Sequence, residues 1–310
     1  MIKYLVILLD DTSTSYCHCE NSSQLSSLIP IDVLRNGIFY AMTENLLVQF
    51  VYPEYRLPEE YDELIEMVNH VKILPVASPY TGDVVVVEWN MIDKVADHVP
   101  SLVVRADLNE LIRSYEVLSY LFDKADKINV VIKDIINHSD DELARYCETL
   151  GKLSDILKIQ YAKGSSVQFN LITDRMMLST MNNCNAGYEN ITLAPNGKFY
   201  VCPAFYYEDL FSIGSLTDGL DIKNQQLYRL DHAPLCRNCD AYQCKRCIWL
   251  NQKTTLEVNT PSHEQCVAAH HERNASRNFL KTLKDQGCIL HCDDIKEISY
   301  LDPFDVRNKF

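Results

Sequence analysis

Short apolar runs alternate with amphipathic stretches up to about residue 175 of the chain. The runs cover residues 4–9, 46–51, 72–77, 84–87, 102–104, 128–132 and 167–171. The run 84–87 is four consecutive valines, a pattern typical of a strand buried on both faces, as in a parallel sheet. We therefore interpret these runs as strands.

Between the runs, apolar residues recur at the spacing of an α-helix. Residues 61–68 and 108–118 each place their apolar side chains on one helical face. Residues 139–142 (Ser-Asp-Asp-Glu) predict a capping box that opens a third helix. Cys147 follows on the apolar face of that helix, so we expect it to be a small core residue.

Repeated strand–helix units predict an α/β fold with a parallel sheet and right-handed crossovers, either an open sheet or a partial (β/α) barrel. Beyond residue 175 the helical periodicity fades, turn signals multiply and cysteines accumulate. We therefore expect two parts: a partial barrel over residues 1–175 and a cysteine-rich domain over residues 176–310.

Seven of the twelve cysteines fall between residues 184 and 266, at spacings typical of metal binding. Residues 236–239 and 244–247 are two CxxC knuckles, and such a turn sets two thiolates within reach of one metal centre. The two knuckles alone would suit one tetrahedral zinc, but Cys184, Cys202 and Cys266 exceed what one zinc site uses. Bound metal can also stabilise a segment that is short of apolar residues.

Charge and the N-terminal segment restrict the partners and the compartment. The formal net charge of −14 argues against nucleic acid, because phosphate contacts need clustered Lys and Arg. An acidic surface could attract a basic peptide, although ordinary solubility is the simpler explanation. The first apolar run is too short for a signal peptide or a membrane span. We therefore expect a cytoplasmic protein without membrane contact, in which cysteines bind metal rather than form disulfides.

The order of the cysteines resembles the SPASM domain, the C-terminal extension of radical SAM enzymes that modify peptides. The order is Cys184-x12-Gly197-x4-Cys202, then the two knuckles, then Cys266. In that family the domain binds two auxiliary 4Fe–4S clusters, and the Gly-x4-Cys element is a hairpin that delivers its cysteine to the first of them. Asn196-Gly197 suits a type I′ turn at this place. The resemblance therefore implies two 4Fe–4S clusters as cofactors.

The family order also implies a ligand set for each cluster. For the first cluster, with a possible open iron, the implied ligands are Cys184, Cys202 and Cys247. For the second cluster, the implied ligands are Cys236, Cys239, Cys244 and Cys266. The family usually shows C-x2-C-x5-C-x3-C, whereas the last two gaps here are four and two. Which cluster takes Cys244 and which takes Cys247 therefore stays open.

The N-terminal part resembles a radical SAM core more loosely, because both halves of the cofactor site are missing. That family carries C-x3-C-x2-C after the first strand, whereas this chain has only Cys17 and Cys19 before Cys147. The family also carries a Gly-Gly-Glu-Pro-like turn after the second strand, where this chain reads Val51-Tyr-Pro-Glu-Tyr-Arg56. We therefore expect no S-adenosylmethionine (SAM) binding, and no radical SAM chemistry by this chain alone.

The residues between and after these cysteines resemble those of the CXXX repeat peptide maturases. It reads Cys-Asp-Ala-Tyr-Gln-Cys-Lys-Arg-Cys-Ile-Trp-Leu-Asn from Cys239, with Glu-Val-Asn-Thr-Pro-Ser before Cys266. These bacterial proteins are associated with ribosomally made, cysteine-repeat precursor peptides (RiPPs) and with a separate radical SAM enzyme. The resemblance implies a role in RiPP maturation with both as partners. Two alternatives stay open: a stand-alone enzyme using an open cluster site without SAM, and a structural zinc-binding adaptor.

The remaining cysteines and histidines have several interpretations. Residues 17–19 (Cys-His-Cys) could bind metal, but three adjacent residues cannot all face one ion. A remnant of the ancestral site, or a thiol pair that handles substrate, is the favoured interpretation. Cys288 and Cys292, with His291 between them, could add ligands, form a redox switch or merely share a helical face. The histidines around Cys266 (263, 270 and 271) could tune a cluster or lie at the surface.

Overall fold

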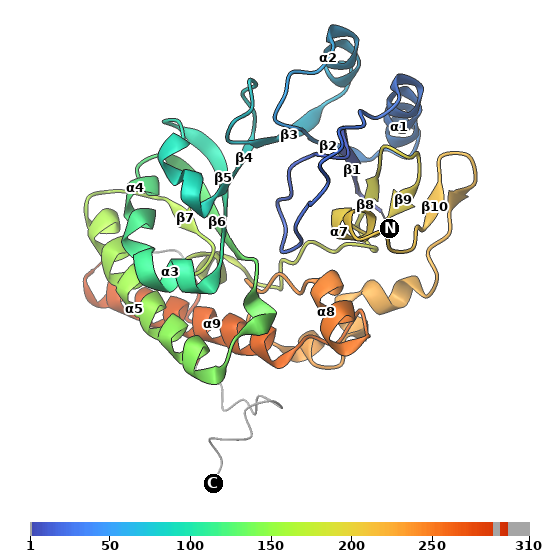
Figure 1. Cartoon of the computed structure of the whole chain (residues 1–310). Coiled ribbons are helices and arrows are strands. Elements are labelled where there is room, and N and C mark those ends of the chain that lie inside the picture. Colours follow the sequence, from blue (N-terminus) through green and yellow to red (C-terminus); the bar gives the residue numbers. More distant parts are fainter. Residues whose placement is uncertain (1, 288–291, 297–310) are drawn as a thin grey trace.

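The computed structural model describes residues 2–287 and 292–296. Within these residues, a nine-stranded sheet has the order β7-β6-β5-β4-β3-β2-β1-β8-β9 (Figure 1). Its strands are β1 (Tyr4–Leu8), β2 (Leu47–Val51), β3 (His70–Pro75), β4 (Val84–Glu88), β5 (Val99–Ala106), β6 (Ala125–Ile132), β7 (Gln168–Phe169), β8 (Asn190–Leu193) and β9 (Phe199–Tyr200). All neighbouring pairs from β7 to β8 are parallel, and β8 pairs antiparallel with β9. The predicted α/β class with a parallel sheet is confirmed.

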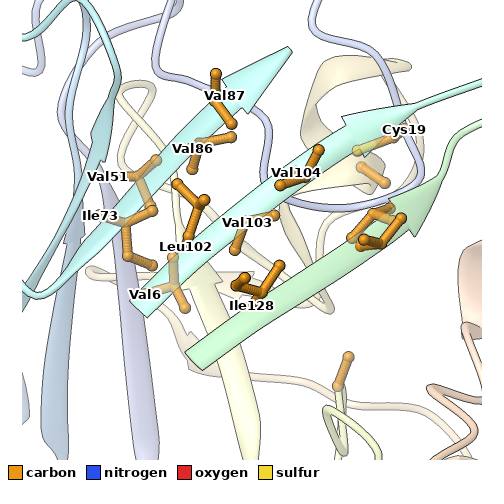
Figure 2. Packing of buried hydrophobic residues seen from close by; sticks show 14 of the residues in the cluster. Val6, Cys19, Val51, Ile73, Val86, Val87, Leu102, Val103, Val104 and Ile128 are labelled. Atoms are coloured by element: carbon orange, nitrogen blue, oxygen red, sulfur yellow. The ribbon is translucent and has the colours of Figure 1, made fainter. Parts of the chain in front are cut away.

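The strands hold together through side chains that are buried on both faces of the sheet. In β1, Leu5 to Leu8 are all fully buried, and Figure 2 shows Val51, Ile73, Val86 and Leu102 of the following strands within the same core. Runs of Val, Ile and Leu form such strands because branched side chains pack well on a pleated surface. The sheet is open, with β7 and β9 at its edges, and the connected strands follow one another in chain order as in a partial barrel.

Helices alternate with the first strands and then dominate the C-terminal half. They are α1 (Ile31–Thr43), α2 (Glu59–Ile65), α3 (Leu108–Ser114), α4 (Leu118–Leu121), α5 (Asp140–Ala162), α6 (Asp174–Met177), α7 (Pro203–Tyr207), α8 (Ile248–Thr255) and α9 (His263–Asp285). Short 3-10 turns lie at η1 (Trp89–Lys94), η2 (Tyr115–Val117), η3 (Ile135–Asn137), η4 (Gln225–Tyr228), η5 (Leu230–His232) and η6 (Cys236–Asn238), and β10 (Gly214–Ser215) pairs with β11 (Gly219–Leu220). Among the described residues, no helix is long and apolar enough to span a membrane.

The capping box at the start of α5 is confirmed, but the interpretation of Cys147 is wrong. Ser139 caps the helix, and its hydroxyl accepts a hydrogen bond from the Glu142 backbone. Cys147, however, is exposed. The buried stripe of α5 runs through Leu143, Tyr146, Leu150, Leu153 and Leu157. Successive residues of a helix point about 100° apart, so with Tyr146 in the buried stripe the next residue, Cys147, points away from it.

Helix α9 contradicts the expectation that helical structure fades beyond residue 175. It begins after Ser262, whose capping box with Gln265 is complete, and it packs beside α5 (Figure 1). The helices run in the same direction, since His263 contacts Asp140 at their starts and the Tyr161 and Phe279 rings lie 5.5 Å apart near their ends. The sequence shows little of the apolar periodicity that predicts a helix here, because only a narrow inner face of α9 is buried and its other positions are polar.

The hairpin between β8 and β9 forms, but its turn is not type I′. Gly197 has a φ of 75°, whereas Asn196 is not among the residues with positive φ, and type I′ requires positive φ at both. The Gly197 N–H instead donates to the Ala194 carbonyl oxygen, so that Pro195 and Asn196 form the turn. Because β8 pairs with β1, the sheet continues past residue 175. The division into residues 1–175 and 176–310 stays a prediction.

Candidate metal centre

Three of the predicted ligands come together from three separate turns of the chain. Cys202 and Cys247 immediately precede α7 and α8, and Cys184 lies in the segment that leads to β8. Burial and, to a smaller extent, the Cys184 thiol raise the pKa of Cys247 to about 12. Burial also raises the pKa of Cys202 well above its ordinary value, with added repulsion from Cys247 and Cys184. The three thiols are therefore close enough to interact electrostatically. We call them the first thiol group.

A second thiol group forms from the two knuckles. Cys236 begins η6, and the Cys239 N–H donates to the Cys236 carbonyl oxygen at 3.1 Å, which closes the first CxxC turn. Burial and, to a smaller extent, the Cys236 and Cys239 thiols raise the pKa of Cys244 to about 12. The group therefore joins both thiols of the first knuckle to the first thiol of the second knuckle.

Helix α9 contacts the second thiol group through His270 and carries Cys266 one turn before it. His270 lies four residues after Cys266, and its Nε2 atom is 3.6 Å from Cys239 Sγ. Residues four apart share one face of a helix, so Cys266 lies on the face that meets Cys239. Six of the seven thiols gather in the two sets that the cysteine order implies, and Cys266 shares a helical face with His270, which contacts the second set. Their roles as ligands stay a prediction.

Backbone N–H groups act on five of these seven sulfurs. Those of Ala241 and Arg246 donate to Cys239 Sγ and Cys244 Sγ, each at 3.4 Å. Those of Ala186 and Ala204 lower the pKa of Cys184 and Cys202, and those of Leu250 and Trp249 lower the pKa of Cys247, against the larger effect of burial. A hydrogen bond to a thiolate favours the charged form, which is the form that binds metal. Hydrogen bonds to sulfur also tune the potential of iron–sulfur clusters.

Positive charge accompanies both thiol groups. The Arg246 guanidinium is buried, donates to the carbonyl oxygens of Tyr228 and Arg229, and lowers the pKa of Cys236 against the larger effect of burial. Arg246 has a φ of 41°, so its backbone turns sharply between the two thiols of its knuckle. Lys245 and Arg246 also lower the pKa of Cys184, although burial raises it more. Thiol donors, amide hydrogen bonds and nearby cations together suit a negatively charged iron–sulfur cluster.

Two further thiols, Cys17 and Cys19 of the loop between β1 and α1, lie near the first thiol group, which the sequence did not predict for them. Burial raises the pKa of Cys17 well above its ordinary value, with added repulsion from Cys19, Cys202, Cys184 and Cys247. Cys19 is 1% exposed and lies within the core that Figure 2 shows. Nothing local in the sequence indicates this, because the contacts join residues more than 160 positions apart.

A cavity of about 70 Å³ lies between the end of β6 and the two thiol groups. His18, Cys244, Cys247 and Glu272 are among its lining residues. Burial raises the pKa of Glu272 to about 7, although the Tyr146 hydroxyl, which donates to its Oε1 at 2.8 Å, lowers it. The cavity therefore carries a carboxyl group that titrates near neutral pH, beside residues from both parts of the chain.

The remaining thiols are placed as follows. All the cysteines in residues 2–287 and 292–296 are free thiols. In the same residues, no group of three or more His, Cys, Asp or Glu side chains could hold a single metal ion. Cys292 is partly buried, whereas Cys288 and His291 lie outside the described residues, so the predicted C-x3-C pair stays a prediction.

The segment after β2, where the radical SAM family carries its glycine turn, is filled by an aromatic side chain. Tyr52 is fully buried, and its ring lies 5.0 Å from that of Tyr80. After β1, the Asp10 carboxylate accepts hydrogen bonds from the backbone of Thr12 and from Tyr55. The side chains that follow β1 and β2 are therefore engaged in contacts with other residues of the chain.

No family model matches the chain, and no curated protein does. The fold is similar to that of hexahistidine-tagged anSMEcpe, an anaerobic sulfatase-maturating enzyme, with bound AdoMet. That likeness has a TM-score of 0.61 and 14% identity, and it covers 91% of this chain and 99% of that one. Native anSMEcpe with AdoMet and the Cp18Cys peptide has a TM-score of 0.58 and 13% identity, with the same coverage. The complex with the Kp18Cys peptide also has a TM-score of 0.58, with 12% identity and the same coverage. The chain thus has the α/β fold of these radical SAM, SPASM-type neighbours.

Proposed function

We propose that the chain is a cytoplasmic iron–sulfur protein of ribosomal peptide maturation. It holds two 4Fe–4S clusters, acts on a cysteine-repeat precursor peptide and works with a separate radical SAM enzyme. The observation that supports this proposal is the gathering of Cys184, Cys202 and Cys247 in one group and of Cys236, Cys239 and Cys244 in another. The fold, shared with an AdoMet-bound enzyme also solved with peptides, supports a peptide as substrate.

The proposed ligands follow the two thiol groups. Cys184, Cys202 and Cys247 hold the first cluster, and Cys236, Cys239, Cys244 and Cys266 hold the second. When bound, such clusters supply electron transfer, and an open iron supplies a site for a thiolate. The amide donors and Arg246 stabilise thiolates at these positions, and burial excludes water around them. The part beyond residue 175 therefore forms the cluster-binding domain in this proposal.

The chain's own residues argue that SAM cleavage belongs to the partner enzyme. Only Cys17 and Cys19 follow β1, so the three-thiolate arrangement that leaves one iron free for SAM cannot form there. Tyr52 occupies the position where a glycine turn would receive the amine of SAM. The similar anSMEcpe structures hold AdoMet, so direct measurement is the decisive test of this point.

The test of the proposed function is metal analysis of the full chain. Protein produced and reconstituted without oxygen should be brown and carry about eight irons and eight sulfides, as two four-iron clusters require. A colourless protein with one or two zinc ions and no sulfide would favour the structural zinc adaptor and end the cluster proposal. Modification of a cysteine-repeat peptide by the pure chain, with no radical SAM enzyme present, would favour a stand-alone enzyme.

A further inference from the structure

The cavity of about 70 Å³ lies where the carboxyl end of β6 meets the second knuckle and α9. Residues 130–132, residues 243–247 and four residues of α9 are among its lining. Ligands of open α/β sheets bind beyond the carboxyl ends of the strands, which is the position of this cavity. Of the seven proposed cluster ligands, only Cys244 and Cys247 line it, one from each thiol group. The cavity is therefore the space of neither cluster.

Gln243 brings a hydrogen-bond acceptor without a partner to this cavity. The residue is 3% exposed. Its Nε2 donates to the Ala269 carbonyl oxygen at 2.6 Å and to Glu272 Oε2 at 3.4 Å, which fixes the orientation of the amide. Its Oε1 is buried and has no hydrogen-bond partner among the residues that the structure describes. A buried acceptor of this kind is costly unless a donor reaches it.

Two further residues of the lining offer acceptors. Glu272 accepts from the Tyr146 hydroxyl at 2.8 Å and from Gln243, and a carboxylate has about four acceptor sites, so it can accept more. His18 Nδ1 lies 2.9 Å from the Ile132 carbonyl oxygen. Because a carbonyl oxygen only accepts, this contact assigns the proton to Nδ1, and Nε2 of the neutral ring is then an acceptor. Acceptors from three residues therefore line the cavity.

The two cations of the lining have partners outside the cavity. Lys245 Nζ lies 4.0 Å from Asp174 Oδ2, and the Arg246 guanidinium donates to the carbonyl oxygens of Tyr228 and Arg229. None of these three partner residues lines the cavity. Most of the remaining lining is apolar and includes Val130, Ile132, Leu171, Leu250 and Ala268. The cavity thus suits a group that donates several hydrogen bonds and has an apolar stem.

We propose that this cavity binds the side chain of a lysine of the precursor peptide, and that its ammonium group donates to Gln243 Oε1 and to the Glu272 carboxylate. This inference rests on the proposed function, because it names a residue of that peptide. A cavity of roughly 150 Å³ holds benzene, so about 70 Å³ suits roughly three non-hydrogen atoms, such as Nζ and the last two methylene carbons. The wider, planar guanidinium of arginine needs more room, whereas the ammonium of lysine is a compact donor on a flexible stem.

The charge of the chain and the exposure of the lining favour this ligand. The formal net charge of −14 attracts a basic peptide, and Glu272 supplies a negative charge at the site. The Lys245 side chain is 39% exposed and Glu272 is only partly buried, so the cavity can be entered from solvent. A lysine bound here lies beside Cys244 and Cys247 and brings the neighbouring peptide residues towards both thiol groups.

The experiment measures the affinity of two synthetic cysteine-repeat peptides for the reconstituted full chain. Both are acetylated at the N-terminus; one carries lysine between its cysteines, and the other carries norleucine, which has the stem without the ammonium group. Wild type should bind the lysine peptide at least about tenfold more tightly, because charge-assisted hydrogen bonds to buried acceptors are strong. In Glu272→Gln, and in Ala268→Leu, which fills the cavity from α9, the two affinities should become nearly equal.

Glu148→Gln, the same substitution at an exposed position of α5, is the matched control and should keep the preference of wild type. Iron analysis of each variant separates loss of lysine recognition from loss of the clusters. Equal affinities of wild type for the two peptides would overturn this proposal and leave the proposed function in place. A preference for lysine that survives in both Glu272→Gln and Ala268→Leu would do the same. Failure of the cluster-loaded wild type to bind either peptide would instead overturn the proposed function.

Discussion

Replacement of Arg105 by Met should destabilise the chain by about 3–5 kcal/mol, because the guanidinium holds the loop that carries Cys17 and Cys19. Arg105 is 4% exposed and donates to both cysteine carbonyl oxygens. Each charged hydrogen bond of this kind contributes roughly 1.5–3 kcal/mol, and its loss leaves a carbonyl oxygen inside the protein without its Arg105 donor. Met keeps the length of the side chain, so packing losses are small.

The ion pairs of Arg105 add little to this figure. Its partners Glu20 and Glu88 have 59% and 37% of their side chains exposed, so water screens their charges. Exposed pairs contribute about 0–1 kcal/mol each. Most of the expected loss therefore comes from the two carbonyl contacts.

The assay is urea unfolding of the metal-free, reduced protein, repeated at low and high salt. The exposed Arg113→Met is the matched control and should change the free energy of unfolding by less than about 0.5 kcal/mol. Added salt should change the difference in free energy of unfolding between Arg105→Met and wild type by less than roughly 1 kcal/mol, since salt screens only the ion pairs. A loss no larger than that of Arg113→Met, or one that high salt abolishes, would refute the reasoning.

Three further predictions concern the thiol groups, SAM and pH. Cys184→Ala should lose about half of the iron and stay soluble. Cys239→Ala should lose more, because Cys239 closes the first knuckle, which leads into the second knuckle that carries Cys247; equal losses in iron analysis would contradict the assignment. The pure chain should yield no 5′-deoxyadenosine from SAM under reducing conditions, and its detection by chromatography would reverse this conclusion. Because burial raises the pKa of Glu272 to about 7, its contribution to stability is full below the unfolded value and is lost as the pH rises through 7. The effect of Glu272→Gln on the free energy of unfolding of the metal-free protein should therefore be more stabilising at pH 8 than at pH 5, by up to roughly 3 kcal/mol. Equal effects of the substitution at both pH values would contradict this.

Local patterns were enough to predict a parallel sheet and its strands β1 to β7. The four valines of β4 and the apolar run of β1 each lie within one buried strand, and the capping box at Ser139 opens α5 as expected. Such features depend on neighbours in the sequence, because strand burial and helix capping act over a few residues. The spacing of the knuckles likewise predicted the tight turns that bring thiols together.

Other features depend on contacts that no local pattern encodes. Cys147 was expected in the core, yet its exposure depends on which face of α5 meets α9. The length of α9 was missed, because its buried face is narrow and includes polar residues such as Arg273 and Ser276. The turn before β9 differs as well, since Pro195 and Asn196 form it in place of Asn196 and Gly197.

The sequence by itself determined an α/β chain with a parallel sheet and the spacing of two CxxC knuckles. Tertiary structure alone decided that β8 pairs with β1 and that Cys17 and Cys19 join Cys184, Cys202 and Cys247. The physical reason is sequence separation. Periodicity reports which side of an element is buried, but not which distant segment covers it. The meeting of the N-terminal loop with the first thiol group depends on Arg105, Tyr206 and Tyr207, whose partners lie far away along the chain.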